Sequence, residues 1–180
     1  MKAAVLRERF RERAGLAAGA SLREWVEAVR VIPYGRPSLR SAEGVVEEWR
    51  GTCSTKHALL AALLEPWPEL RTRQVHRVYR VTPEGAVRWG QVAVRTVPPE
   101  GLVDVHTYVR VMLEGRRTIL DVTFPGAPWD GRSDMAIACE AGEDFEVAEG
   151  ADASAMKAAL VARYCDPRVR EPFIAALSRV

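Results

Sequence analysis

The stretch Gly51-Thr52-Cys53-Ser54-Thr55-Lys56-His57-Ala58-Leu59-Leu60-Ala61-Ala62-Leu63-Leu64 determines how the rest of the chain is arranged. Alanine and leucine are strong helix formers. Thr52 or Ser54 can accept a hydrogen bond from a free backbone N–H and begin the helix, and Pro66 cannot continue it. Because the run is apolar almost all round, we expect a central helix over residues 51–65, buried within the domain.

Cys53 is expected in the first turn of this helix. The amino terminus of a helix carries a partial positive charge, which favours the thiolate form of a cysteine. A thiolate is a strong nucleophile, and an adjacent imidazolium lowers the pKa of the thiol further. The sequence therefore predicts a reactive thiol, and a partner for it elsewhere in the chain.

The composition limits the class of protein. The chain has 180 residues, of which 48% are hydrophobic and 28% charged, which is typical of one globular domain over residues 1–180. A net charge of +2 gives no basic footprint for nucleic acid. No apolar run approaches the roughly 20 residues that span a bilayer, and the amino terminus lacks the apolar centre of a secretory signal. We therefore expect a cytoplasmic protein with neither a nucleic-acid nor a membrane partner.

The three cysteines are Cys53, Cys139 and Cys165. They are far apart, odd in number and form no Cys-x-x-Cys pair, so free thiols in a reducing compartment are expected rather than a disulfide framework. Cys139 and Cys165 are interpreted as core or surface thiols without a role.

Residues 1–50 are predicted to be helical. An amphipathic helix is expected over 2–17, and Ser21 with Glu24 forms a capping box for a second helix. The core positions of that helix, at helical spacing, are Trp25, Val26, Val29 and Ile32. Ser41 is expected to cap a short helix that runs through Trp49. The turn-forming stretch 33–37, which contains Tyr34 and Arg36, is either a surface loop or the lining of a pocket.

After Pro68 the apolar periodicity changes from helical to alternating, which predicts an antiparallel sheet over 74–123. Tight turns between the strands favour a meander. The four expected strands are 74–81, 87–97, 103–113 and 117–123. A long loop follows over 124–150, and two helices capped by Asp152 and Asp166 are expected within 152–180. The fold class is thus α+β.

His106 and Asp121 are expected to meet on this sheet. If Glu114-Gly115 is a two-residue hairpin turn, Tyr108 pairs with Asp121, and His106 lies diagonal to Asp121 on the same face. A diagonal separation of about 7–8 Å between backbones allows a carboxylate to hold an imidazole. Asp121 lies among apolar residues, where an unpaired charge is costly, so it needs such a partner.

The other two histidines are weaker candidates. His57 shares a helix face with Cys53 but points parallel to it, so it is interpreted as a hydrogen-bonded residue near the pocket or in the core. Cys53 and His57 could also supply two metal ligands, but no further pair of ligands is evident. We therefore expect neither a metal nor a cofactor. His76 alternates with Val75 and Arg77 along a strand, which favours a solvated position.

Gly-Thr-Cys at the start of an apolar helix, followed by a mid-strand histidine and Leu-Asp-Val-Thr on the next strand, resembles the transglutaminase-like group of papain-type cysteine enzymes. The resemblance covers roughly residues 45–125. It implies a papain-like fold with Cys53 as nucleophile, His106 as base and Asp121 as the residue that orients the base. Tyr108 stands where the family often has tryptophan or asparagine, and Val122 where it often has proline.

The resemblance implies thiol-dependent acyl transfer from a peptide-like or other amide substrate, through a thioester. The backbone N–H of Cys53 is one natural oxyanion donor. Candidates for the second donor or for substrate contacts are Tyr34, Arg36, Trp49, His57 and Tyr108. Whether water or an amine receives the acyl group, and which oligomer forms, is not encoded in any motif.

Three alternatives stay open at this point. The chain could be an arylamine N-acetyltransferase-like enzyme, although those are generally longer. It could be a binding module on the same fold without catalysis. It could also bind a metal through Cys53 and His57. Thiol reactivity separates an enzyme from a binding module, and metal analysis tests the third alternative.

Overall fold

The computed structural model describes residues 3–179. Its helices are α1 (Ala3–Ala14), α2 (Leu22–Arg30), α3 (Ala42–Glu48), α4 (Cys53–Leu64), α5 (Pro83–Ala86), α6 (Gly90–Val94), α7 (Ala153–Tyr164) and α8 (Pro167–Leu177), with short 3-10 turns η1 (Pro68–Leu70) and η2 (Val87–Trp89). Its strands are β1 (Arg73–Val81), β2 (Leu102–Leu113), β3 (Arg116–Leu120) and β4 (Gly142–Glu146). The predicted α+β class is confirmed.

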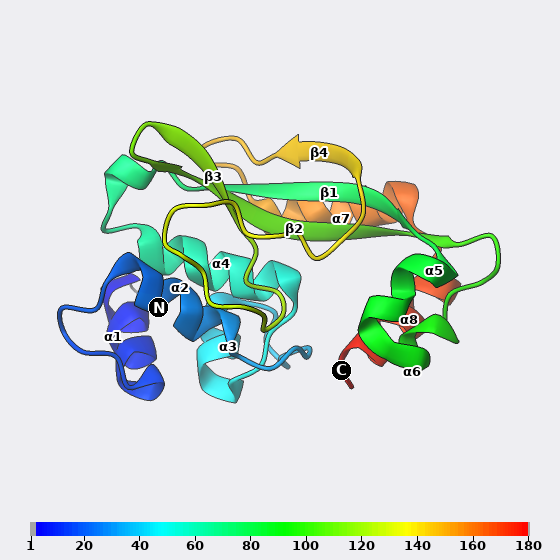
Figure 1. Cartoon of the computed structure of the whole chain (residues 1–180), viewed down its shortest axis with the longest axis horizontal. Coiled ribbons are helices and arrows are strands. Elements are labelled where there is room, and N and C mark those ends of the chain that lie inside the picture. Colours follow the sequence, from blue (N-terminus) through cyan, green and yellow to red (C-terminus); the bar gives the residue numbers. More distant parts are fainter. Residues whose placement is uncertain (1–2, 180) are drawn as a thin grey trace.

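The strands form one antiparallel sheet in the order β3-β2-β1-β4. In Figure 1, α4 lies below this sheet and α7 behind it. Helices α1, α2 and α3 gather around α4 at one end of the molecule, while α5, α6 and α8 gather at the other. The segment between β3 and β4 crosses the front of the sheet. Strands β1 and β2 are thus covered on both faces.

The expected strand over 87–97 is wrong, and so is the meander that depended on it. Thr82 caps α5 by accepting a hydrogen bond from the backbone N–H of Gly85, and Pro83 occupies the first helical position. The buried residues of this segment recur at helical rather than alternating spacing: Ala86, Trp89, Ala93 and Val97. The apparent alternation came from the valines between them, among which Val87 and Val92 are exposed.

The fourth strand comes instead from the stretch that was expected to be a loop. β4 pairs with β1 in the register Arg77↔Asp144, so it forms one edge of the sheet. Its sequence, Gly-Glu-Asp-Phe-Glu, is acidic and lacks the β-branched residues typical of strands. Arg77 compensates by binding the Asp144 carboxylate through two nitrogens, at 2.7 and 2.9 Å.

The helices of the amino-terminal part form as predicted. Ser21 and Glu24 make both hydrogen bonds of a capping box, and the expected core stripe of α2 is buried. Ser41 caps α3, and α4 begins after Thr52. On α1, Leu6 and Phe10 are buried, whereas Val5 is half exposed. These helices pack with the leucines of α4 against Val109 and Val111 of β2 to form the larger core.

The β2–β3 hairpin has the predicted two-residue turn. Glu114 and Gly115 both have positive φ angles, 49° and 79°, as the tightest hairpin turns require. Leu113 therefore pairs with Arg116, and the ladder continues to Val109↔Leu120. This register determines which side of the sheet the residues beyond Leu120 face.

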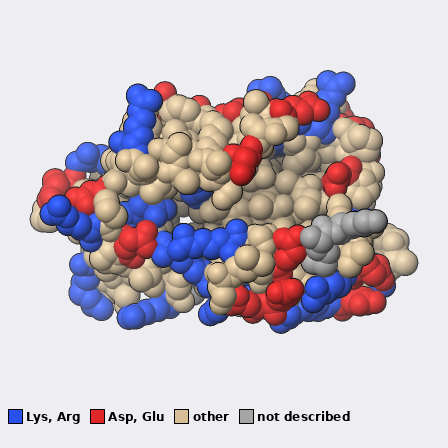
Figure 2. All heavy atoms as spheres, turned by 180° about the vertical axis from the view of Figure 1, so that it is seen from behind, with Lys and Arg blue, Asp and Glu red and all other residues tan. Residues whose placement is uncertain are grey.

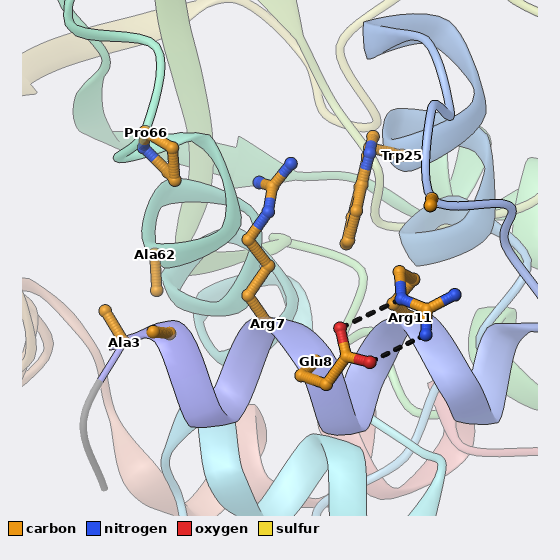
Figure 3. Close-up of a pocket in the computed structure, with 9 residues that line it drawn as sticks. Ala3, Arg7, Glu8, Arg11, Trp25, Ala62 and Pro66 are labelled. Atoms are coloured by element: carbon orange, nitrogen blue, oxygen red, sulfur yellow. Dashed lines mark hydrogen bonds and ion pairs between the residues drawn. The ribbon is translucent and has the colours of Figure 1, made fainter.

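A cavity of about 320 Å³ lies beside α1, at the carboxyl end of α4 (Figure 3). The guanidinium of Arg7 lies 4.0 Å from the ring centre of Trp25 and 4.2 Å from that of Trp67, and it donates a hydrogen bond to the carbonyl of Leu63. These contacts tie α1 to the end of α4. We interpret this cavity as part of the helix packing, with no role in chemistry.

Within residues 3–179, no helix is both long and apolar enough to cross a membrane. Figure 2 shows acidic and basic side chains interspersed with uncharged ones on the face opposite to that of Figure 1. Neither sign of charge covers that face, in keeping with the small net charge of the chain.

Candidate active site

Cys53 is the first residue of α4 and lies almost fully buried, with 8% of its surface exposed. The backbone N–H of Thr52, the capping residue, donates to the hydroxyl of Thr55, which fixes the first turn. A residue at this position has a backbone N–H outside the helical hydrogen-bond ladder. The thiol and this free N–H therefore stand together at the positive end of the helix dipole.

The structure brings His106 and Asp121 together as the hairpin register requires. His106 lies in β2, and Asp121 directly follows β3. The Nε2 atom of His106 is 2.7 Å from Oδ2 of Asp121. His106 also interacts electrostatically with the Cys53 thiol, and the interaction lowers the pKa of the thiol and raises that of the ring. Since Asp121 occupies Nε2, Nδ1 is the ring nitrogen left for the sulfur. The three residues thus form a connected series from thiol to imidazole to carboxylate.

The Asp121 carboxylate accepts four hydrogen bonds. Oδ2 accepts from His106 Nε2 and from the backbone N–H of Ala138, at 2.7 and 2.8 Å. Oδ1 accepts from the backbone N–H of Thr123 at 3.0 Å and from its hydroxyl at 2.5 Å. Every partner is a donor, so the surroundings suit an ionised carboxylate. The burial of Asp121 would raise its pKa, but His106 and these hydrogen bonds hold the pKa well below its ordinary value.

Electrostatics favour a thiolate beside an imidazolium. Burial by itself raises the pKa of the Cys53 thiol, but Lys157 and then His106 outweigh it and lower the pKa to about 6. Burial by itself lowers the pKa of His106, but Asp121, together with Cys53, raises it well above its ordinary value. At neutral pH the site therefore holds a negative sulfur and a positive ring.

Cys53 meets β2 where the edge of that strand is open. β3 pairs with β2 only from Val109 to Leu113, so the residues from Leu102 to Tyr108 have a strand partner, β1, on one side alone. His106 and Thr107 point to opposite faces of the sheet. His106 interacts electrostatically with Cys53 from one face, and Lys157 bonds both Cys53 and Thr107 of the other face, so groups from both faces of the sheet act on the sulfur.

Lys157 is the site residue that the sequence analysis missed. It lies on α7, 104 positions after Cys53, and its Nζ atom is 3.2 Å from Cys53 Sγ. The chain contains only three lysines against 23 arginines, and both lysines among residues 3–179, Lys56 and Lys157, are buried. That imbalance was a signal in the sequence, because lysine is retained where its compact, three-donor ammonium is needed.

A cavity of about 360 Å³ opens at the sulfur. It lies between the amino end of α4, the loop before α3, and helices α7 and α8. Two of the predicted candidates, Tyr34 and Arg36, line it together with Cys53 and Lys157. The 33–37 stretch is therefore a pocket lining. Tyr34 stacks on Phe124, with ring centres 5.0 Å apart. Arg36 is bound to Glu171 of α8 at 2.7 Å.

Three other candidates lie outside this cavity, so the structure does not support their predicted contact with the substrate. Trp49 ends α3 and stacks on Phe10, with ring centres 5.7 Å apart, within the amino-terminal core. Tyr108 is fully buried, and its hydroxyl donates to Asp144 at 2.8 Å. His57 is also fully buried, and both of its ring nitrogens are hydrogen-bonded.

His57 has a structural role close to the site. Its Nδ1 atom is 2.6 Å from the carbonyl of Cys53, and its Nε2 atom accepts the backbone N–H of Val122 at 3.0 Å. These two bonds require a neutral ring with the proton on Nδ1. Burial lowers the pKa of His57 to about 4, in agreement with that state. The residue connects the first turn of α4 to the segment that carries Asp121.

The prediction that His76 is solvated is wrong. His76 is buried beneath α7, with Nδ1 3.0 Å from the Thr107 hydroxyl and Nε2 2.8 Å from the carbonyl of Ala153. The alternation along β1 suggested one solvent-exposed face, but α7 covers that face. Burial, followed by the charge of Lys157, lowers the pKa of His76 to about 4.

Acidification is expected to destabilise the fold through these two histidines. Both have folded-state pKa values near 4, below the ordinary 6.5, so the unfolded chain binds more protons between these values. Their contribution to stability is complete above pH 6.5 and is lost as the pH falls towards 4. Between about pH 6.5 and 5, the free energy of unfolding should fall by about 3 kcal/mol.

Urea denaturation at several pH values measures this effect. The variant His76→Gln, which cannot take up the proton, should lose about half of the pH dependence. A free energy of unfolding that stays constant or rises as the pH falls through this range would contradict the neutral assignment of both rings.

The described residues contain no group of three or more His, Cys, Asp or Glu side chains that could hold a metal ion. Cys53 and His57 share a helix, but both nitrogens of His57 are engaged as described above. Cys139 is buried and Cys165 partly buried, and burial raises their thiol pKa values to about 12 and 11. Of the three cysteines, Cys53 is therefore the one whose surroundings favour reaction.

Comparison of the chain with models of protein families, with curated proteins and with solved structures found no match.

Proposed function

We propose that the chain is a thiol-dependent acyl-transfer enzyme, an amide or peptide hydrolase or a transglutaminase-like acyltransferase, in which Cys53 is the nucleophile, His106 the acid and base, and Asp121 the orienting carboxylate. The observation that carries this proposal is the 2.7 Å bond between His106 and Asp121, with the Cys53 thiol interacting electrostatically with the same ring from the amino terminus of a buried helix. The placement of the nucleophile on α4 beside an antiparallel sheet supports a papain- or transglutaminase-like arrangement.

The reaction follows from the charges of these groups. The Cys53 thiolate attacks the carbonyl carbon of an amide or ester, forming the S–C bond while the carbonyl electron pair moves onto oxygen. As that pair returns, the bond to the leaving group breaks, and the departing amine takes the proton of the His106 imidazolium. A thioester on Cys53 remains. Neutral His106 then removes a proton from water or from an acceptor amine, which attacks the thioester and releases Cys53.

Asp121 keeps the imidazole in the productive orientation throughout. Its Oδ2 atom binds Nε2, so the ring presents Nδ1 to the sulfur and to the leaving group. The backbone N–H of Cys53 is free to hold the developing oxyanion. The cavity lined by Tyr34 and Arg36 is the place where the acyl group would lie.

Alkylation with iodoacetamide tests the thiolate–imidazolium pair. At about pH 6, Cys53 should react much faster than an ordinary thiol, because its pKa is already near that pH. His106→Ala should slow the reaction by about tenfold, because the thiolate fraction falls about a hundredfold while the more basic thiolate is intrinsically more nucleophilic. Mass spectrometry of peptides locates the label and gives the rate.

Cys139 and Cys165 serve as internal controls within the same sample. Their raised pKa values predict little labelling at about pH 6 in the wild type and in His106→Ala alike. Equal labelling of all three cysteines, or an unchanged rate for Cys53 in His106→Ala, would count against an enzyme and in favour of a binding module.

A further inference from the structure

We propose that Lys157 is a catalytic residue of this site: its ammonium is the second donor that holds the oxyanion of the tetrahedral intermediate, together with the backbone N–H of Cys53. The inference rests on the proposed function and adds to it a residue from a distant helix. Of the predicted candidates, Trp49, His57 and Tyr108 lie outside the cavity. Tyr34 and Arg36 line it, but of these cavity residues it is Lys157 that is hydrogen-bonded to the sulfur.

The ammonium of Lys157 has three neighbours, one for each of its donors. Its Nζ atom lies 3.2 Å from Cys53 Sγ, 3.2 Å from Ser54 Oγ and 3.0 Å from Thr107 Oγ1. Among residues 3–179, no carboxylate lies within ion-pair distance of the Lys157 ammonium, although only 8% of the surface of Lys157 is exposed. The charge that Lys157 faces is therefore that of the thiolate itself.

A buried cation without a carboxylate is costly to the fold. The packing around Lys157 nevertheless holds it in place. Thr107 accepts from Lys157 and can donate to Nδ1 of His76, whose Nε2–H donates to the carbonyl of Ala153 at the start of α7. The low pKa of His76 agrees with its acting as a neutral acceptor here. This line of hydrogen bonds fixes the lysine head beside the sulfur.

The position of the ammonium fits the movement of charge during acylation. In the tetrahedral intermediate, the sulfur and the oxyanion are bonded to the same carbon atom. An ammonium that already contacts the sulfur reaches the oxyanion by a small rotation of its flexible stem. As a thiolate electron pair forms the S–C bond, the carbonyl electron pair moves onto oxygen. The negative charge therefore passes from the sulfur, which Lys157 already contacts, to the oxyanion beside it.

Lys157 keeps its proton in this step. The leaving group takes its proton from His106, and the lysine donates a hydrogen bond only. A lysine suits this role better than the arginine that the chain uses elsewhere. Its ammonium is a compact charge on a flexible stem and can follow the negative charge from sulfur to oxygen, whereas a planar guanidinium is fixed by binding two acceptors at once. The neighbouring wall of the cavity, formed by Tyr34 and Arg36, leaves room for the acyl carbonyl.

Two reagents that attack the same sulfur separate this role from a simple effect on the thiol pKa. Iodoacetamide alkylates Cys53 without forming an oxyanion, whereas p-nitrophenyl acetate acylates it through one. Both rates are measured from about pH 5 to pH 10 for the wild type, Lys157→Met and Lys157→Gln, with the fold of each checked by circular dichroism. Arg163→Met, a change of an exposed cation on the same helix, is the matched control.

We expect the thiol pKa to rise in both Lys157 variants, and alkylation to recover to within about threefold of the wild type once the pH exceeds that pKa. Acylation of Lys157→Met should stay about 100-fold below the wild type at the same high pH, the loss typical of one oxyanion donor. Lys157→Gln, which retains an N–H donor without charge, should lose only about tenfold. If Lys157→Met fails to fold, the ratio of the two rates in Lys157→Gln decides alone.

Recovery of acylation together with alkylation at high pH would overturn the proposal and reduce Lys157 to a group that sets the thiol pKa. The reactivity of wild-type Cys53 tests the proposed function separately, and the proposed function fails if this reactivity is ordinary. In that case wild-type Cys53 reacts with both reagents no faster than an ordinary thiol, and the role of Lys157 is overturned with it.

Discussion

The substitution Asp121→Asn is expected to slow the acylation of Cys53 at neutral pH by about 1,000-fold. The carboxylate accepts hydrogen bonds on both oxygens, from His106 and Ala138 on one side and from Thr123 on the other. The asparagine amide has one oxygen and one NH₂ group, so its NH₂ must face one of these sets of donors, from which it cannot accept a hydrogen bond. The imidazolium loses its counter-charge, so the pKa of His106 falls and that of Cys53 rises.

The pH dependence of p-nitrophenyl acetate hydrolysis measures this loss. The rise in rate with the ionisation of Cys53 should move to higher pH in Asp121→Asn, while the thiol remains accessible to alkylation at about pH 9. Asp144→Asn is a suitable comparison, because Asp144 is also a hydrogen-bonded aspartate. It lies on β4, where it accepts hydrogen bonds from Arg77 of β1 and Tyr108 of β2. A hydrolysis profile of Asp121→Asn that matches the wild type would contradict the assigned role.

Lys56→Met is expected to cause the largest loss of stability among the substitutions considered, about 3–5 kcal/mol. The Nζ atom of Lys56 donates to three backbone carbonyls, of Arg30 at 2.9 Å, Ile32 at 2.8 Å and Thr123 at 3.0 Å. Methionine fills a similar volume but leaves three buried acceptors without partners. The lysine is fully buried and joins the end of α2 and the segment after Asp121 to the central helix.

Urea unfolding of Lys56→Met and of Arg23→Met tests this expectation. Arg23 lies exposed on α2, so its replacement removes a cation without changing a buried contact, and its stability should stay within about 0.5 kcal/mol of the wild type. A loss in Lys56→Met no larger than that of Arg23→Met would show that the three carbonyls are satisfied in some other way. Because Thr123 donates a hydrogen bond to Asp121, we also expect acylation of Cys53 to decrease in Lys56→Met.

The position of Cys53 and the His106–Asp121 contact could be predicted because each depends on a local rule, whereas the approach of Cys53 to His106 was expected only from the resemblance to the transglutaminase-like group. The cap at Thr52 places Cys53 at the start of its helix, and the Glu114-Gly115 turn determines the register of the hairpin. Once the register is known, the faces of His106 and Asp121 follow from the alternation of side chains along strands.

The parts of the site that were not predicted depend on long-range packing. Lys157 reaches Cys53 only because α7 packs behind the sheet, and nothing local to residues 153–164 indicates that place. The same helix buries His76, which the alternation of β1 had suggested to be exposed. β4 forms although its acidic sequence resembles a loop, because Arg77 and Arg110 bind Asp144 across the sheet.

Errors of orientation have a related cause. Trp49 and Tyr108 lie near Cys53 or His106 in the sequence, but the left-handed backbone at Trp49 directs its ring towards Phe10, and Tyr108 binds Asp144. For Tyr34 and Arg36 the sequence left a surface loop and a pocket lining open; they line the pocket because Tyr34 forms a β-bridge with Gly51, directly before α4.

The most direct test of the account is the mass of the intact protein after brief mixing with p-nitrophenyl acetate and acid quenching. We expect one acetyl group per chain, located on Cys53 by peptide mapping, in the wild type and not in Cys53→Ser or His106→Ala at neutral pH. Acetylation of His106→Ala at the wild-type rate, or acetyl groups distributed over other side chains with Cys53 unmodified, would contradict it.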